Sequence, residues 1–195
     1  MRVKALWLVA AALTLTFGAS SAPAQDVAQD AAVQRELPNF HRVNEGLYRG
    51  GQPGPDGFRR LARLGVKTVI NLRDDDAHAR AEGEAARAEG LRYYNVPLGR
   101  LGRPAEAEVE RVLRLIDSQD GQPVFVHCHK GADRTGLVIA VYRMTHEGWT
   151  ADRAQEEANR YGMRRWQLGK KDFIHDYYRD HLLGGGTPPK PGVSR

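Results

Sequence analysis

Cys128 and Arg134 are the two residues whose types and spacing are best suited to chemistry. Cys128 is the only cysteine in the chain, and Arg134 follows it by six positions. Positive charge and the N–H groups at a helix N-terminus lower a thiol pKa, and the resulting thiolate is a strong nucleophile. A guanidinium presents a planar fork of donors that fits an oxyanion. The pair therefore predicts attack by sulfur on a substrate whose anionic oxygens are held by arginine.

The surrounding residues predict a strand, a tight loop and a helix. Residues 124–126 read Val-Phe-Val, which is typical of a strand buried on both faces. Gly131 allows a sharp turn. Residues 137–141 are apolar on all sides and indicate a buried helix. The loop thus ends at a helix N-terminus, where unpaired N–H groups and the helix dipole favour an anion.

The run from 127 to 136, HCHKGADRTG, resembles the C-x5-R-[ST] signature loop of the cysteine-based tyrosine and dual-specificity phosphatases. Shorter matches at 47–53, 71–73 and 148–149 resemble the atypical dual-specificity branch of bacteria, fungi and plants. The resemblance implies that Cys128 attacks phosphorus, that Arg134 holds the phosphoryl oxygens, and that a cysteinyl-phosphate is then hydrolysed. It also implies a phosphate-binding loop formed by His129, Lys130, Gly131, Ala132, Asp133, Arg134 and Thr135.

A lone cysteine after an apolar strand is more often a small buried hydrophobe. Here the glycine, the following Thr-Gly and the strand-to-helix context coincide, which favours the nucleophile. The preceding His127 is expected to order the loop rather than to act as a base. A single cysteine also cannot form a disulfide within the monomer.

The general acid is not assigned by the pattern. These phosphatases usually carry an aspartate in the loop after the third strand, but residues 99–104 read Gly-Arg-Leu-Gly-Arg-Pro. Asp74, Asp75 and Asp76 come from the neighbouring loop and are the possible acids, although such a run is more often a solvated turn. No spacing of His, Asp and Glu indicates a metal site, and no cofactor is expected.

The order of elements predicts an α/β fold with a central, largely parallel sheet flanked by helices, like that of dual-specificity phosphatases. Because active sites lie beyond the carboxyl ends of parallel strands, Cys128, the loop after Leu72 and the loop after Leu98 should share one edge. The expected strands cover 46–49, 66–72, 91–98 and 124–126, and the expected helices cover 58–62, 77–89, a segment opened by Pro104, 134–146, 150–161 and 171–183.

The N-terminal residues 1–24 predict a cleaved signal peptide. Arg2 and Lys4 precede an apolar run too short to span a bilayer comfortably, and Ala22-Pro23-Ala24 has the small-x-small cleavage pattern. An uncleaved anchor is the alternative, and no second apolar stretch has spanning length. We expect an exported, periplasmic or secreted protein with a flexible leader at 25–36, a phosphatase domain at 37–183 and a disordered tail at 184–195.

Removal of 24 of the 195 residues leaves 171, enough for one domain. Loss of Arg2 and Lys4 lowers the formal net charge from +5 to +3, and this mild charge, without a recognition motif, does not indicate nucleic acid. The predicted function is that of a phosphotyrosine or dual-specificity protein phosphatase, which hydrolyses phosphate monoesters. An inositol-phosphate or phosphoinositide phosphatase is the alternative, since Lys130, Arg100 and Arg103 suit a polyanion, and a non-catalytic phosphate-binding module is another. The expected partner is a phosphorylated protein or a small phosphorylated polyol.

Overall fold

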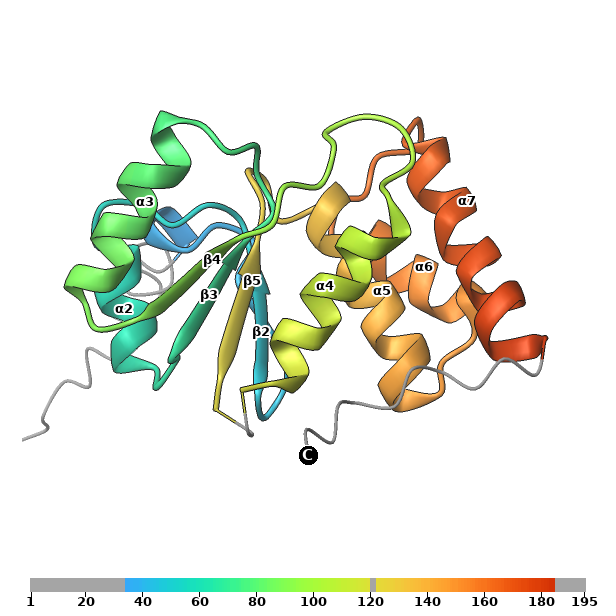
Figure 1. Ribbon diagram of the computed structural model, residues 1–195, viewed down its shortest axis with the longest axis horizontal. Helices are drawn as coiled ribbons and strands as arrows, with labels where there is room; N and C mark the ends of the chain where they lie inside the picture. Colours follow the sequence, from blue (N-terminus) through green and yellow to red (C-terminus); the bar gives the residue numbers. More distant parts are fainter. Residues whose placement is uncertain (1–33, 120–121, 185–195) are drawn as a thin grey trace, which may run out of the picture.

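The computed structural model describes residues 34–119 and 122–184, which form a five-stranded sheet. The sheet lies between two layers of helices (Figure 1). The strand order is β1-β2-β5-β3-β4. β2 (Leu47–Gly50), β5 (Val124–His127), β3 (Thr68–Asn71) and β4 (Arg92–Asn95) run parallel, and β1 (His41–Asn44) is antiparallel to β2. The prediction of an α/β fold with a largely parallel central sheet is confirmed.

The edge strand β1 is the element that the sequence pattern does not reveal. It pairs with β2 through a short turn, and its register shifts between Arg42 and Asn44. None of its four side chains is fully buried. A short, half-exposed edge strand lacks the apolar run by which the inner strands are recognised.

The helices form two layers, one on each face of the sheet (Figure 1). The first layer contains α2 (Gly57–Arg63) and α3 (Ala77–Ala88), and the second contains α4 (Glu106–Asp117), α5 (Asp133–Glu147), α6 (Ala151–Arg160) and α7 (Leu168–Tyr177). The smaller hydrophobic core, around Phe58 and Leu61, lies between the sheet and the first layer, and the larger core surrounds Leu137 and Val138 on the other face.

The C-terminal helix differs from the expected segment 171–183. α7 begins at Leu168, three residues before the expected start, and Lys170 in its first turn is buried. Residues Tyr178–Leu183 continue as the π-helix η1. Phe173, Ile174 and Tyr177 of α7 are buried in the core.

β5 and α5 are the central elements of the domain. Val124, Phe125 and Val126 are at most 1 % exposed, and residues 137–141 of α5 are equally buried. The loop between them is therefore held at both ends by the most deeply packed elements, so its backbone is fixed with little freedom.

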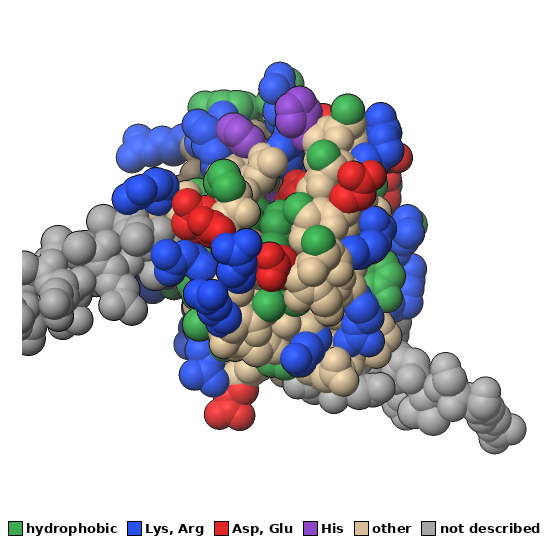
Figure 2. All heavy atoms as spheres, turned by 90° about the vertical axis from the view of Figure 1, so that its left-hand side faces the viewer, with side chains coloured by type: hydrophobic (Ala, Val, Ile, Leu, Met, Phe, Trp, Pro, Cys, Tyr) green, Lys and Arg blue, Asp and Glu red, His purple; other side chains and the backbone are tan. Residues whose placement is uncertain are grey.

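The outer surface of α2, α3 and the residues that precede them carries Arg side chains interspersed with Asp and Glu (Figure 2). Several of these charges are paired, for example Arg59 with Asp56 at 2.8 Å. This arrangement is that of a solvated helix face. None of the helices described here is long and apolar enough to cross a bilayer.

Candidate active site

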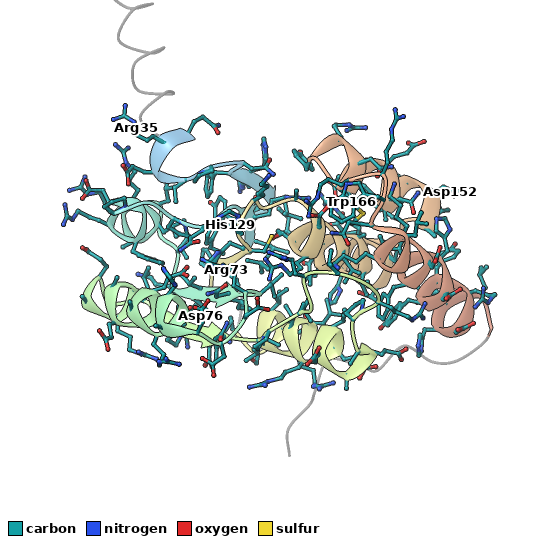
Figure 3. The ribbon with its side chains drawn as sticks, turned by 90° about the horizontal axis from the view of Figure 1, so that it is seen from above. Arg35, Arg73, Asp76, His129, Asp152 and Trp166 are labelled. Carbon is teal, nitrogen blue, oxygen red and sulfur yellow. The ribbon has the colours of Figure 1, made fainter. Side chains whose placement is uncertain are left out.

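A cavity of about 850 Å³ opens at the carboxyl edge of the sheet. Cys128, directly after β5, and Arg134, in the first turn of α5, both line it. Figure 3 looks down on this edge, with His129 and Arg73 near its centre and Trp166 toward the α6–α7 side. The loops after β3, β4 and β5 meet here, as parallel-sheet topology predicts.

The Cys128 thiol lies in surroundings that stabilise its anion. Burial is the largest single influence and raises its pKa, but hydrogen bonds from the hydroxyl and N–H of Thr135, the charge of Arg134 and the N–H of Gly131 together outweigh it. The net effect is a pKa below the usual value for cysteine. The buried Thr135 hydroxyl has no other hydrogen-bond partner within the described residues, so its proton is free to turn to the sulfur. A thiolate is thus favoured at the cavity floor.

Gly131 is required by the path of the loop. Its φ is +68°, and a Cβ there would lie 2.4 Å from the carbonyl carbon of Gly50 and 2.5 Å from the nitrogen of Gly51. An L side chain would therefore suffer both an unfavourable φ and a backbone clash. Close packing of the loop on residues 50–51 explains why the short match at 47–53 accompanies the signature loop.

Arg134 is 6 % exposed and reaches from α5 toward the end of β3. Its Nη1 donates to the carbonyl oxygen of Leu72 at 3.3 Å. This bond fixes the plane of the guanidinium while its remaining N–H groups are available to an anion above Cys128.

His127 lies behind the loop in a buried polar network. Its Nε2 is 2.8 Å from Oε1 of Glu82 in α3, and its Nδ1 is 3.4 Å from the carbonyl oxygen of Cys128. Asn71 donates to the other Glu82 oxygen at 3.1 Å and is itself bonded to Tyr93 at 2.8 Å. These contacts link β5, β3 and α3 beneath the nucleophile, an arrangement that suits the loop-ordering role expected of His127.

The three adjacent aspartates have different places. Asp74 lines the cavity with Cys128. Asp75 is 3.7 Å from Arg80 and borders a separate hollow against α3 and β4. Asp76 caps α3 by accepting from the N–H of Ala79 at 2.9 Å, which lowers its pKa. Of the three, the structure brings Asp74 to the site.

The loop after β4, where the family's acid usually lies, is tied down by a buried lysine. Lys170 is 1 % exposed, and its Nζ donates to the carbonyl oxygens of Arg100 and Gly102, each at 3.2 Å. A third bond at 3.2 Å goes to Gln167. The loop presents Arg100 and Leu101 to the cavity, and no carboxylate.

Asp133 belongs to the signature loop, but its carboxylate faces the loop between α6 and α7. It accepts from the backbone N–H of Arg164 at 2.9 Å and from Nε of the same residue at 2.8 Å. The Arg164 guanidinium stacks on the ring of Trp166 at 4.0 Å. Trp166, 56 % exposed, is thereby fixed at the cavity wall. No sequence pattern signals this chain of contacts.

The cavity wall is strongly basic. Arg73, Arg100, Lys130 and Arg164 line it besides Arg134. Arg100 and Lys130 make no side-chain ion pair or hydrogen bond within the described residues, whereas Arg164 is neutralised by Asp133. Burial, followed by the charges of neighbouring Arg and Lys side chains, lowers the pKa of His129. Within residues 34–119 and 122–184, no group of three His, Cys, Asp or Glu residues is placed to hold a metal ion.

The family model described as "DSP-PTPase phosphatase fused to NAD+ Kinase" matches residues 24–176. The chain therefore belongs to this family of cysteine-based dual-specificity phosphatases, as the signature loop predicts. It is 35 % identical over 139 residues to Dual specificity protein phosphatase TpbA of Pseudomonas aeruginosa, which covers 71 % of this chain and 59 % of TpbA. The chain thus spans about three fifths of the length of that relative.

Three further comparisons agree with the family. Inositol diphosphatase DSP4 of Arabidopsis thaliana is 24 % identical over 140 residues, which covers 70 % of each chain. The crystal structure of P. aeruginosa TpbA has a TM-score of 0.64 and 28 % sequence identity, covering 77 % of this chain and 91 % of that chain. TpbA has also been crystallised in complex with pTyr, and that structure has a TM-score of 0.61.

Proposed function

We propose that this chain hydrolyses phosphate monoesters, with phosphotyrosine-type aryl phosphates as its preferred substrates. The observation that carries the proposal is the Cys128 sulfur at the floor of a basic cavity, with the N–H groups of Gly131 and Thr135 and the Arg134 charge turned toward it. This arrangement holds a phosphoryl group directly above a thiolate.

The reaction proceeds in two displacements. The Cys128 thiolate attacks phosphorus, the ester P–O bond breaks, and the leaving oxygen takes up a proton. Water then attacks the cysteinyl-phosphate, the S–P bond breaks, and inorganic phosphate and the thiolate are released. Arg134 and the loop N–H groups stabilise the equatorial phosphoryl oxygens in both transition states.

The apolar side chains at the mouth of the cavity are suited to contact an aromatic leaving group. Trp166 and Leu101 line it, and both are more than half exposed. A phenolate also needs less protonation than an alkoxide, which suits a site whose usual acid loop has no carboxylate. TpbA, the relative crystallised with pTyr, supports the same substrate class.

The decisive experiment compares the unmodified protein with Cys128→Ser on p-nitrophenyl phosphate and a phosphotyrosine peptide. We expect turnover by the unmodified protein, none by Cys128→Ser, and retained orthovanadate binding by that variant because the backbone cradle remains. Arg134→Lys should be severely impaired, since an ammonium lacks the two-donor fork. Turnover that survives in Cys128→Ser would contradict the mechanism. Phosphate binding without turnover by the unmodified protein would identify a binding module instead.

A second candidate function is hydrolysis of a small phosphorylated polyol, such as an inositol phosphate. It is favoured by Arg100 and Lys130, which line the cavity without anionic partners in the described part of the chain. The name of the relative DSP4, an inositol diphosphatase, points the same way. Parallel assays on phosphotyrosine peptides, phosphoinositides and inositol polyphosphates separate the two candidates by the ratio of kcat/KM.

Export is also part of the proposal. It is supported by the charged, apolar and small-residue regions of residues 1–24, which lie outside the described residues, as do the leader up to residue 33 and the tail from 185. A single cysteine, without a partner for a disulfide in the chain, suits nucleophilic use in an oxidising compartment. Fractionation of cells that express the full chain, with N-terminal sequencing, tests it. An intact N-terminus in the cytosolic fraction would contradict export.

A further inference from the structure

Two consecutive carbonyl groups of the signature loop are held by one asparagine. Asn39 Nδ2 is 3.2 Å from the carbonyl oxygen of Lys130 and 3.1 Å from that of Gly131. The same amide nitrogen lies 3.0 Å from the carbonyl oxygen of Tyr161. Asn39 has a φ of +51°, a left-handed conformation that asparagine tolerates better than most residues. The side chain thus links the signature loop to the C-terminal end of α6.

A buried arginine supports the second of these carbonyls. Arg49, on β2, is 1 % exposed, and its Nη2 donates to the carbonyl oxygen of Gly131 at 2.8 Å. The guanidinium stacks over the ring of Tyr161 at 4.4 Å. Its Nε and Nη1 have no partner within the described residues, and burial lowers its pKa to about 10. Stability alone does not account for a buried charge with two unused donors.

The direction of these carbonyls determines where the next N–H groups point. In a trans peptide, the C=O of one residue and the N–H of the following residue point in opposite directions. The described residues contain no cis peptide. When Lys130 C=O is held outward, Gly131 N–H points inward, where it helps to lower the pKa of Cys128. When Gly131 C=O is held outward, the N–H of Ala132 is turned inward in the same way.

We propose that Asn39 and Arg49 are positioning residues that act through the carbonyls of Lys130 and Gly131 to keep the N–H groups of Gly131 and Ala132 directed at the Cys128 sulfur and the bound phosphoryl group. Without these donors, either peptide plane is free to rotate and to present a carbonyl oxygen to the anion. The thiolate and the oxyanion then lose stabilisation together. If Asn39 and Arg49 only stabilised the fold, their replacement would change neither the ionisation of Cys128 nor the affinity for an oxyanion in the protein that remains folded.

The test uses the full chain and two changes at Asn39. Asn39→Gly removes the amide without straining the positive φ, and Asn39→Asp keeps the shape but replaces the donor with an acceptor. Asn44→Gly, in β1 and bonded to Tyr142 rather than to the loop, is the matched control. Because Cys128 is the only cysteine, the pH profile of iodoacetamide alkylation reports its ionisation directly. Orthovanadate affinity reports the anion cradle, and thermal unfolding reports stability.

We expect Asn39→Gly to move the alkylation midpoint to higher pH and to weaken orthovanadate binding about tenfold, the effect of losing one or two hydrogen bonds. Asn39→Asp should do more in both respects. Asn44→Gly should leave both readouts unchanged. Arg49→Lys keeps the positive charge but loses the planar guanidinium. It should shift the alkylation midpoint and the orthovanadate affinity in the same direction as Asn39→Gly. If Arg49→Lys fails to fold, the two Asn39 variants decide the matter.

The proposal is overturned if a folded Asn39→Gly protein lowers the melting temperature but keeps the alkylation profile and the orthovanadate affinity of the unmodified chain. Neither readout requires turnover. The experiment therefore remains informative if the protein proves to be a binding module, and its failure is distinguishable from failure of the proposed phosphatase activity.

Discussion

At the scale of single residues, Asp74 differs from Asp75 and Asp76 in what its carboxylate faces. Asp76 is occupied as a helix cap and Asp75 lies against Arg80, whereas Asp74 lines the cavity above the nucleophile. The loop that carries the acid in related enzymes offers Arg100 and Leu101 instead. We therefore propose Asp74, rather than Asp75 or Asp76, as the group that protonates a leaving oxygen.

The first prediction follows from this placement. Asp74→Asn should reduce the rate on alkyl phosphates, including phosphoserine peptides, about a hundredfold while nearly sparing aryl phosphates, because general acid catalysis helps most when the leaving oxygen is strongly basic. Rates on a series of phosphate esters of increasing leaving-group pKa measure it, with Asp75→Asn as the control. Equal losses on all esters, or the same loss in Asp75→Asn, would contradict the assignment.

The sequence predicts those parts of the site that are local in the chain. Cys128 and Arg134 lie in one contiguous run, so strand, turn and helix signals place them together. Arg49 and Asn39 act on Gly131 across 82 and 92 positions. Such contacts depend on how β2 and the segment before β1 pack against the loop, and no spacing in the sequence encodes that packing.

At the scale of elements, apolar periodicity predicted every strand of the parallel sheet and the main helices. It missed β1, whose side chains are half exposed, and the start of α7, where Lys170 is buried by carbonyl partners rather than by apolar neighbours. Both exceptions have the same cause. The pairing of β1 with β2 and the hydrogen bonds from Lys170 to loop carbonyls are tertiary interactions between polar groups. They produce no hydrophobic pattern in the sequence.

The junction of α4 and α5 yields the second prediction. His146, in the last turn of α5, lies 2.8 Å from Oδ1 of Asp117 at the end of α4. The hydrogen bond to Asp117 is the largest influence on its pKa, which is raised. A raised folded-state pKa means that the stabilisation is complete below the ordinary pKa of histidine, about 6.5, and is lost as pH rises through the folded value.

His146→Gln should therefore lower the melting temperature by about 2–4 °C at pH 5.5, corresponding to about 1 kcal/mol for an exposed ion pair near a helix C-terminus. At pH 9 the variant and the unmodified chain should differ little. Thermal unfolding followed by circular dichroism at the two pH values measures this, with the exposed His78→Gln as control. A larger loss at pH 9 than at pH 5.5 would show that the neutral imidazole is the stabilising form.

At the scale of the whole molecule, the cavity combines two kinds of surface. Its floor and one wall are cationic, with Arg134, Arg73 and Lys130, and its mouth has the exposed Trp166 and Leu101. The two surfaces come from different parts of the fold, joined by the Asp133–Arg164 pair, which links the signature loop to the α6–α7 loop. The phosphate site and the indole are thus kept at a fixed separation.

The last prediction uses that separation. If the indole contacts the aromatic ring of a bound aryl phosphate, Trp166→Ala should raise KM for a phosphotyrosine peptide about two- to tenfold, in line with an aromatic contact of about 0.5–1.5 kcal/mol. Inhibition by orthophosphate, which reaches only the floor, should be unchanged. Leu168→Ala removes a similarly exposed apolar side chain that does not line the cavity, and it should have no effect.

Hydrolysis of inositol polyphosphates should depend instead on Arg100 and Lys130. If Trp166→Ala leaves KM for the peptide unchanged while Lys130→Met raises KM for the polyphosphate, the cavity is built for a polyanion and the preference for aryl phosphates is wrong.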